Sequence, residues 1–169
     1  CGSTGWNDGL EEAYQATKVN NTGFLQASNF SVGVNIFFEI NKHLARLMNA
    51  HPDYDIVMEE THHTQKKDAP SGTAVKTAEV ILKELERKKE WSLQLSNAGQ
   101  ASNEIPIIAK REPNVPGTHT VTYTSNVDYI EIKHEAKSRR GFAEGAVMAA
   151  RFLIGKRGVF EMKDLLRTV

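Results

Sequence analysis

Three segments of the chain carry apolar residues at every third or fourth position, as one face of an α-helix does. In the first segment they are Ile36, Phe37, Ile40, Leu44, Leu47 and Met48. In the second they are Val75, Ala78, Ile81, Leu82 and Leu85. In the third they are Phe142, Ala146, Ala149, Ala150 and Leu153. We expect the first helix to run from a cap at Ser31 to His51-Pro52-Asp53, the second from Ser71 or Thr73 to Arg87-Lys88-Lys89, and the third to be capped by Gly155.

Shorter apolar stretches, several of them alternating with polar residues, predict strands between and after these helices. The expected strands cover residues 24–27, 54–61, 105–110, 118–125 and 129–134. The last two are joined by Asn126-Val127-Asp128 and should form a hairpin. We also expect a short helix from Asn7 or Asp8 through Lys18, a loop over 97–100 and a last helical turn over 164–166. Helices that alternate with strands, followed by a cluster of strands, predict an α/β (α+β) fold with a mixed sheet.

Composition and charge narrow the possible classes of function. At 169 residues, with 40% hydrophobic and 25% charged residues, the chain is typical of a globular domain with a core of ordinary size. Lysine plus arginine equals aspartate plus glutamate at 21 each, so no bulk charge would attract nucleic acid or an anionic membrane. No apolar run approaches the roughly 18 residues of a membrane span. The single cysteine, Cys1, excludes an intrachain disulfide framework and makes a reducing, cytoplasmic compartment the expected one.

The segment from His62 to Thr73 concentrates polar chemistry between an expected strand and an expected helix. Imidazole is a common proton donor, so one of the adjacent His62 and His63 suits proton donation and the other suits substrate binding. Lys66 adds a positive charge nearby. Ser71-Gly72-Thr73 stands at a helix N-terminus, where free backbone N–H groups bind carboxylates and phosphates. Together these groups have what a site needs to hold a small dianion and protonate it.

Each of these residues, taken alone, also has an ordinary structural interpretation. Ser71 can be a helix N-cap, Lys66 a solvated cation, and the histidines partners of loop carbonyl groups. Adjacent residues on a strand point to opposite faces, so we do not expect His62 and His63 to share a metal ion, and we predict no metal site. Two other clusters, 2–5 and 137–141, could contact a dinucleotide or an anion, or could be plain turns. Only the coincidence of several groups in one loop favours a ligand site.

The stretch from Glu60 to Ala74 resembles the signature E-x-H-H-x-x-K-x-D-A-P-S-G-T-A of bacterial dihydrodipicolinate reductases. Three more blocks resemble that family in the same order along the chain. They are Gly2-Ser3-Thr4-Gly5, Asn29-Phe30-Ser31-Val32-Gly33-Val34-Asn35, and Ser138-Arg139 followed by Phe142-Ala143-Glu144-Gly145-Ala146. The tail 155–162 is also similar to the C-terminus of the family, so the resemblance covers essentially the whole chain.

The resemblance implies an NADH- or NADPH-dependent reductase of the diaminopimelate route to lysine, acting on a small cyclic dicarboxylate to give tetrahydrodipicolinate. His62 matches the proton donor of the family, and Lys66 matches its catalytic lysine. The positions that match substrate-binding residues are His63, Ser71, Gly72 and Thr73. The positions that match cofactor-contacting residues are Gly2, Ser3, Thr4, Ala27, Ser28, Asn29, Phe30 and Arg139. The same resemblance implies a homotetramer, while the cysteine count and the charge balance given above predict a cytoplasmic protein with no nucleic-acid or membrane partner.

The resemblance also implies a domain organisation. Residues 1–30 and 140–169 would belong to a Rossmann-type dinucleotide-binding domain, and residues 31–139 to a substrate-binding and oligomerisation domain. The family's Gly-x-x-Gly-x-Met-Gly phosphate loop does not occur in the sequence, so we expect most of the nucleotide-binding domain to be missing and activity to be poor. Pro113 stands where the family commonly has glycine. Two alternatives are another two-domain NAD(P)-dependent dehydrogenase of a small carboxylate, and a non-catalytic module for oligomerisation or ligand binding.

Overall fold

The computed structural model describes residues 1–3, 5–94 and 103–167 of the chain. These residues form two compact units. One comprises Cys1–Ile36 together with Arg139–Val169, and the other comprises Phe37–Ser138. The second unit is therefore one continuous segment, while the first is assembled from the two ends of the chain.

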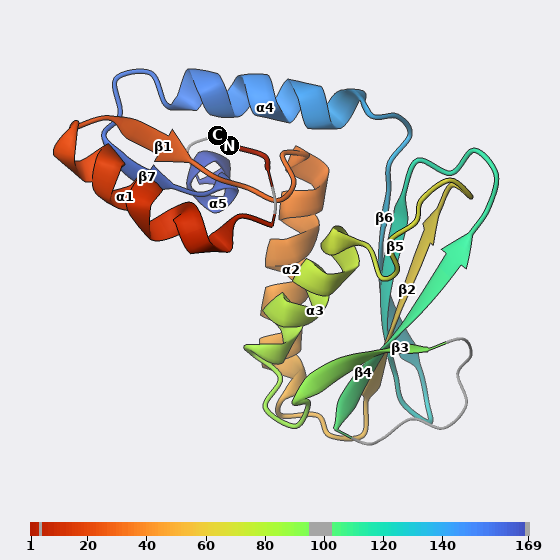
Figure 1. Ribbon diagram of the computed structural model, residues 1–169. Coiled ribbons are helices and arrows are strands. Elements are labelled where there is room, and N and C mark those ends of the chain that lie inside the picture. The colour runs from red at the N-terminus through yellow and green to blue at the C-terminus, as the bar shows by residue number, and fades with distance from the viewer. Residues whose placement is uncertain (4, 95–102, 168–169) are drawn as a thin grey trace. The chain divides into compact units, whose positions relative to one another are not determined.

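The segment Phe37–Ser138 is built on a five-stranded mixed sheet, shown in Figure 1. Its strands are β2 (Asp55–His62), β3 (Glu90–Gln94), β4 (Glu104–Arg111), β5 (Thr118–Thr124) and β6 (Tyr129–Glu135). They lie in the order β3-β4-β2-β5-β6. The β3–β4 and β4–β2 pairs are parallel, and the β2–β5 and β5–β6 pairs are antiparallel. The predicted α/β fold with a mixed sheet is confirmed, as is the hairpin between its last two strands.

One face of this sheet is buried by helices, and the alternation of side chains on the central strand decides which face that is. Along β2 the buried residues alternate with partly exposed ones, and they are Ile56, Met58, Glu60 and His62. Val121 and Tyr123 of the neighbouring β5 are also buried. The helix α3 (Gly72–Leu82) and the later part of α2 (Val32–Met48) lie along this face in Figure 1. Glu60 and His62 thus extend the same row of buried side chains as the apolar Ile56 and Met58.

The helix α3 ends at Leu82, five residues before the predicted end at Arg87-Lys88-Lys89. The predicted extension was wrong because the residues that follow contact distant parts of the same unit. The Arg87 guanidinium donates to the carbonyl oxygens of Met48 and Tyr54, each at 2.6 Å. Lys88 is 3% exposed and lies 2.7 Å from Asp55. These cations stabilise the start of β2 and do not extend the helix.

The unit formed by the two chain ends contains a small parallel sheet and several helices. Its elements are the 3-10 helix η1 (Asn7–Gly9), α1 (Leu10–Val19), β1 (Gly23–Leu25), α4 (Arg140–Phe152), β7 (Gly158–Phe160) and α5 (Met162–Leu166), joined by the first turns of α2. A core of Leu25, Ala149, Met162 and Leu165 holds them together. Gly145 of α4 passes so close to the main chain that an added Cβ would lie 1.8 Å from the carbonyl oxygen of Phe30. Only glycine allows this approach.

The structure also corrects several predicted boundaries. The first strand ends at Leu25, two residues early, and α1 begins only at Leu10, without a side-chain cap, because a 3-10 turn precedes it. The helix α4 ends at Phe152, with Leu153 as its C-cap and Gly155 two residues further on at φ +72°. The strands β3 and β7 were not predicted, and the predicted loop 97–100 lies outside the described residues. Within the described ranges, no helix combines the length and the apolar character that crossing a bilayer would need.

Candidate functional site

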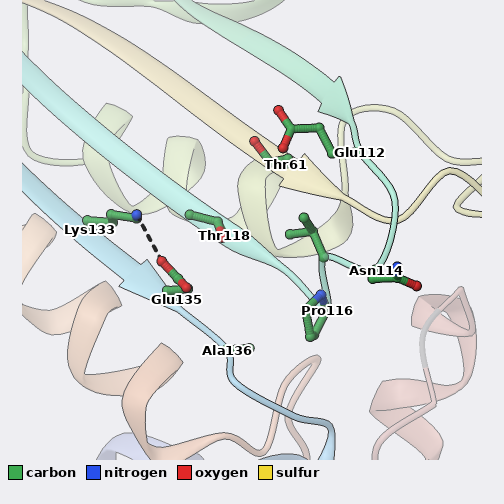
Figure 2. Close-up of a pocket in the computed structure, with 9 residues that line it drawn as sticks. Thr61, Glu112, Asn114, Pro116, Thr118, Lys133, Glu135 and Ala136 are labelled. Atoms are coloured by element: carbon green, nitrogen blue, oxygen red, sulfur yellow. Dashed lines mark ion pairs between the residues drawn. The ribbon is translucent and has the colours of Figure 1, made fainter.

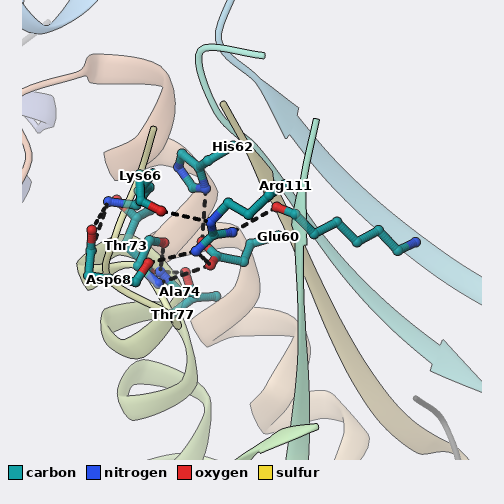
Figure 3. Close-up of polar contacts among 10 residues, drawn as sticks. Glu60, His62, Lys66, Asp68, Thr73, Ala74, Thr77 and Arg111 are labelled. Atoms are coloured by element: carbon teal, nitrogen blue, oxygen red, sulfur yellow. Dashed lines mark hydrogen bonds and ion pairs between the residues drawn. The ribbon is translucent and has the colours of Figure 1, made fainter. Parts of the chain in front are cut away.

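The loop from His63 to Ser71 connects the end of β2 to the start of α3, and it brings the predicted polar groups to one place (Figure 3). His62 is the last residue of β2 and is 8% exposed. Its carbonyl oxygen accepts a hydrogen bond from the N–H of Glu112 at 2.9 Å, which continues the pairing of β2 with β4. The parallel neighbour therefore fixes the backbone of the predicted proton donor.

Glu60 is the buried centre of this region, and the sequence analysis did not single it out as a functional residue. It is 1% exposed, and its Oε2 lies 3.0 Å from Nδ1 of His62. Its Oε1 accepts hydrogen bonds from the backbone N–H of Ser71 and from the Arg111 guanidinium, both at 3.1 Å. Burial alone would raise the pKa of Glu60, but the contacts with His62, Ser71 and Arg111 outweigh burial and lower it to about 2. Glu60 is thus an ionised carboxylate at neutral pH.

Arg111 connects Glu60 to the loop that carries Lys66. Besides the carboxylate, its guanidinium contacts the carbonyl oxygen of Asp68 at 2.6 Å and that of Lys66 at 3.3 Å (Figure 3). The sequence analysis missed this residue because it comes from β4, far along the chain. The signal for Glu60 was present: it lies two positions before His62, on the same face of a predicted strand.

His119 of β5 is a second buried imidazole in contact with His62. The two ring centres are 5.1 Å apart, with an angle of 69° between the ring planes. Burial is the main reason that the pKa of His119 falls to about 3, and the neighbouring His62 lowers it further. His119 is therefore uncharged at neutral pH. Its Nδ1 has no hydrogen-bond partner among the described residues.

Donor atoms of Glu60, His62 and His119 lie within 4.8 Å of one another. This is a different grouping from the adjacent His62 and His63, which we had considered for a metal. The 3.0 Å separation between the carboxylate and the imidazole is that of a charge-assisted hydrogen bond, and Arg111 already occupies the other carboxylate oxygen. We therefore interpret the cluster as a close carboxylate–imidazole pair beside a neutral imidazole.

Gly117 leaves space beside the second nitrogen of His62. A Cβ added at this position would lie 3.0 Å from Nε2 and 3.3 Å from Cδ2 of that ring. Any larger residue would press against the nitrogen that faces away from Glu60. The glycine therefore passes close to Nε2 without placing a side chain against it.

The remaining predicted substrate residues surround the turn into α3. Lys66 lies 2.7 Å from the carboxylate of Asp68, so its charge is partly balanced in the absence of a ligand. Ser71 is the N-cap of α3, since its hydroxyl oxygen accepts from the N–H of Ala74 at 3.2 Å. Gly72 is exposed and open, and Thr73 follows it in the first turn. His63 is half-buried next to His62.

A cavity of about 350 Å³ opens on the other face of the same sheet (Figure 2). It is lined by Thr61, Thr118, Lys133 and Glu135, among others, and the last two form an ion pair at 2.9 Å. Thr61 alternates along β2 with the inward-facing Glu60 and His62, so this cavity is separate from the imidazole cluster. None of the residues predicted to bind substrate lines it.

The predicted cofactor residues belong to the unit made from the two chain ends. The N–H of Ala27 donates to the carbonyl oxygen of Cys1 at 3.1 Å, so the segments 1–3 and 27–30 lie side by side. A Cβ added at Gly2 would lie 3.1 Å from the ring of Phe30. Ser3 and Ser28 belong to these same two segments, and Asn29 accepts from the N–H of Ser31. Arg139 precedes α4 as its N-cap residue, and Thr4 lies outside the described residues.

Comparison with known proteins gives one consistent answer. A family model described as "Dihydrodipicolinate reductase, C-terminus" matches residues 33–166. A relative from Christiangramia forsetii named 4-hydroxy-tetrahydrodipicolinate reductase is 54% identical over 165 residues, which are 98% of this chain and 67% of the relative. A relative of the same name from Methanosarcina mazei is 41% identical over 153 residues, which are 90% of this chain and 57% of the relative.

A solved structure agrees with these sequence relatives. It is the dipicolinate-bound dihydrodipicolinate reductase from Paenisporosarcina sp. TG-14, which superposes with a TM-score of 0.70 at 25% sequence identity. The match covers 95% of this chain and 61% of that one. The chain thus spans between 57% and 67% of the length of these three proteins.

Proposed function

Because the chain belongs to the dihydrodipicolinate reductase family, we propose that this protein reduces 4-hydroxy-tetrahydrodipicolinate to tetrahydrodipicolinate, with loss of water, in the diaminopimelate route to lysine. The observation that carries the proposal is the assembly of His62, Lys66 and the start of α3 in one loop of a chain so similar to named reductases. An acid, a cation and a helix N-terminus are the groups that a small dicarboxylate requires.

The proposed division of roles follows from the geometry. His62 donates the proton to the electron-rich centre that hydride addition creates, through the nitrogen beside Gly117. Lys66 binds a substrate carboxylate in place of its present partner Asp68, which is 59% exposed at its side chain and can turn to solvent. The N–H groups of Gly72 and Thr73, together with His63 and Ser71, bind the remaining carboxylate oxygens.

A nicotinamide cofactor, NADH or NADPH, would supply the hydride when bound. The residues that would hold its nicotinamide end are Gly2, Ser3, Thr4, Ala27, Ser28, Asn29, Phe30 and Arg139. The backbone at Gly2 is compatible with such a role, because this residue has no side chain to fill the space beside Phe30. The sequence contains no glycine-rich phosphate loop of the family type, so these residues alone would bind the cofactor weakly.

We further propose that residues 31–139 form the substrate-binding and oligomerisation domain of a cytoplasmic homotetramer, and that residues 1–30 and 140–169 belong to the cofactor domain. The strand β6 lies at one edge of the sheet, and five of its seven residues are exposed. An exposed edge strand of this kind is a ready surface for pairing with another subunit. Light scattering on the purified protein tests the tetramer directly.

The proposed activity is tested by assaying the product of the intact gene with 4-hydroxy-tetrahydrodipicolinate and each cofactor in turn. Replacing His62 with Gln should lower kcat by on the order of a hundredfold, as expected for loss of a general acid. The same substitution at the exposed His51 is the control and should change nothing. Full activity of H62Q, or turnover of a different dicarboxylate in place of this substrate, would overturn the proposal.

A further inference from the structure

Glu60 is a buried charge, and substrate binding does not explain why a charged residue stands at this position. Burying a carboxylate costs several kcal/mol unless the charge is paired and its oxygens are hydrogen-bonded. Three groups from separate segments pair with it here: His62 two residues away, the N–H of Ser71 at the start of α3, and Arg111 from β4. A strand that is otherwise apolar on this face holds a charge at the point where the catalytic loop begins.

We propose that Glu60 is the positioning residue of the reaction, which holds the His62 ring by Nδ1 so that Nε2 is the nitrogen that transfers the proton. This inference rests on the proposed function, since it assigns Glu60 a role in that same proton transfer. The carboxylate oxygen Oε2 lies 3.0 Å from Nδ1, and Nδ1 has no other polar partner among the described residues. Once the ring has given up a proton it is therefore left with its hydrogen on Nδ1, and Nε2 is the atom that must be recharged.

The surroundings of the ring support this orientation. Gly117 presents no side chain to Nε2, whereas Nδ1 faces a fully buried carboxylate. His119 packs against the ring at a 69° angle and is uncharged at neutral pH, so it fixes the ring plane without competing for the negative charge of Glu60. The ring is thus in contact with Glu60 and His119, and Gly117 adds no side chain beside Nε2.

The same carboxylate also positions the cation of the site. Arg111, bound to Glu60, donates to the carbonyl oxygens of Lys66 and Asp68 and thereby holds the backbone from which Lys66 extends. The N–H of Ser71 ties the start of α3 to the same oxygen. The acid, the cation and the helix N-terminus are therefore linked through one buried side chain.

The first test reads the hydrogen position on His62 in the chain itself. Long-range nitrogen–proton spectra of the ¹⁵N-labelled chain, taken at a pH where imidazoles are neutral, distinguish the two tautomers. We expect His62, assigned from the spectrum of H62Q, to carry its hydrogen on Nδ1. The exposed His51 provides the comparison within the same spectrum. A hydrogen on Nε2 of His62 would overturn the proposal.

The second test compares two neighbouring carboxylates of β2 in the intact gene product. Glu60→Gln should lower kcat by on the order of a hundredfold with KM changed by no more than about threefold. The glutamine carbonyl oxygen can still accept from Ser71 and Arg111, so the binding groups stay in place, whereas the carboxylate oxygen beside Nδ1 is lost. Glu59→Gln is the matched control, since Glu59 also pairs with a cation of β4, Lys110 at 2.8 Å, but is partly exposed. Glu60→Asp keeps the charge and should recover part of kcat. Equal kcat values for E60Q and E59Q would refute the role.

The two tests separate this inference from the proposed function. If the unaltered protein fails to reduce the substrate while His62 shows its hydrogen on Nδ1, the assigned reaction is wrong. Glu60 then orients the His62 ring but has no part in that reaction. If the reaction proceeds and E60Q retains full kcat, the reaction stands and Glu60 is not its positioning residue. Thermal unfolding of E60Q and E59Q shows whether a loss of kcat has a trivial origin in unfolding.

Discussion

Acid should destabilise the unit Phe37–Ser138 chiefly through His119, and the effect can be calculated from the structure. The pKa of this buried imidazole falls from 6.5 to about 3 on folding, so the unfolded chain binds a proton that the folded chain rejects. Stability is therefore lost as the pH falls through 6.5, and the loss levels off near pH 3. Between pH 7 and pH 5 it amounts to about 2 kcal/mol for this one group.

Between pH 7 and pH 5 the effect of His119 on stability can be distinguished from the effect of the buried Glu60 carboxylate. The pKa of Glu60 is lowered by folding from 4.5 to about 2, so its contribution to stability is present above pH 4.5 and is lost as the pH falls towards 2. Over the chosen interval Glu60 changes stability by only about 0.2 kcal/mol. Burial also lowers the pKa of His134, but that residue is present in both proteins to be compared.

The assay compares the chain with its His119→Gln variant, which cannot take up the proton. The two tryptophans of the chain lie in different units, so a Trp6→Phe background leaves Trp91 on β3 as the reporter of this unit. Urea unfolding at both pH values should show the unaltered His119 losing about 2 kcal/mol more than the variant. The exposed His51→Gln variant should behave as the parent does. Equal losses in parent and His119→Gln, within about 0.5 kcal/mol, would refute the reasoning.

Three further substitutions test other parts of the structure. Gly145→Ala places a Cβ 1.8 Å from a carbonyl oxygen and should lower the free energy of unfolding by about 3 kcal/mol or more, measured by Trp6 fluorescence. The control Gly141→Ala on the same helix should lower it by less than about 1 kcal/mol. Gly117→Ala crowds Nε2 of the imidazole that we propose as the proton donor, and it should lower kcat of the proposed reaction at least tenfold. An unchanged kcat would contradict the role assigned to Nε2. Arg87→Met removes two hydrogen bonds to carbonyl oxygens and should destabilise the unit Phe37–Ser138 by about 2 kcal/mol, measured by Trp91 fluorescence. An unchanged free energy of unfolding would show that this arginine does not stabilise the start of β2.

The sequence predicted the parts of the fold that depend on local pattern. The helical spacing of α2 and α4 and the alternation along β2 come from neighbouring residues, so they could be found without knowledge of partners. The short strand β7 was missed because its three residues are strand only through pairing with β1, 135 positions earlier in the register from Gly158 to Gly23. The end of α3 was missed for the same reason. The Arg87 guanidinium donates to the carbonyl oxygens of Met48 and Tyr54, which lie far from it in the sequence.

The candidate site likewise has a part that is local in the sequence and a part that depends on distant strands. The loop from His62 to Thr73 is local, so its residue types could be recognised together. The groups that hold it come from other strands, Arg111 from β4 and His119 from β5, and only the sheet register brings them beside Glu60. Nothing in the spacing of these residues along the chain indicates that they meet.

The way β1 and β7 pair has a consequence for synthesis of the protein. Among the described residues β1 pairs only with β7, which leaves the ribosome 135 residues later, whereas the sheet of Phe37–Ser138 is complete as soon as its own segment has emerged. At translation rates of about 5–20 residues per second, β1 waits on the order of ten seconds for its partner. During that time the loop from His63 to Ser71 can already be in place, since all of its partners belong to the segment that has emerged.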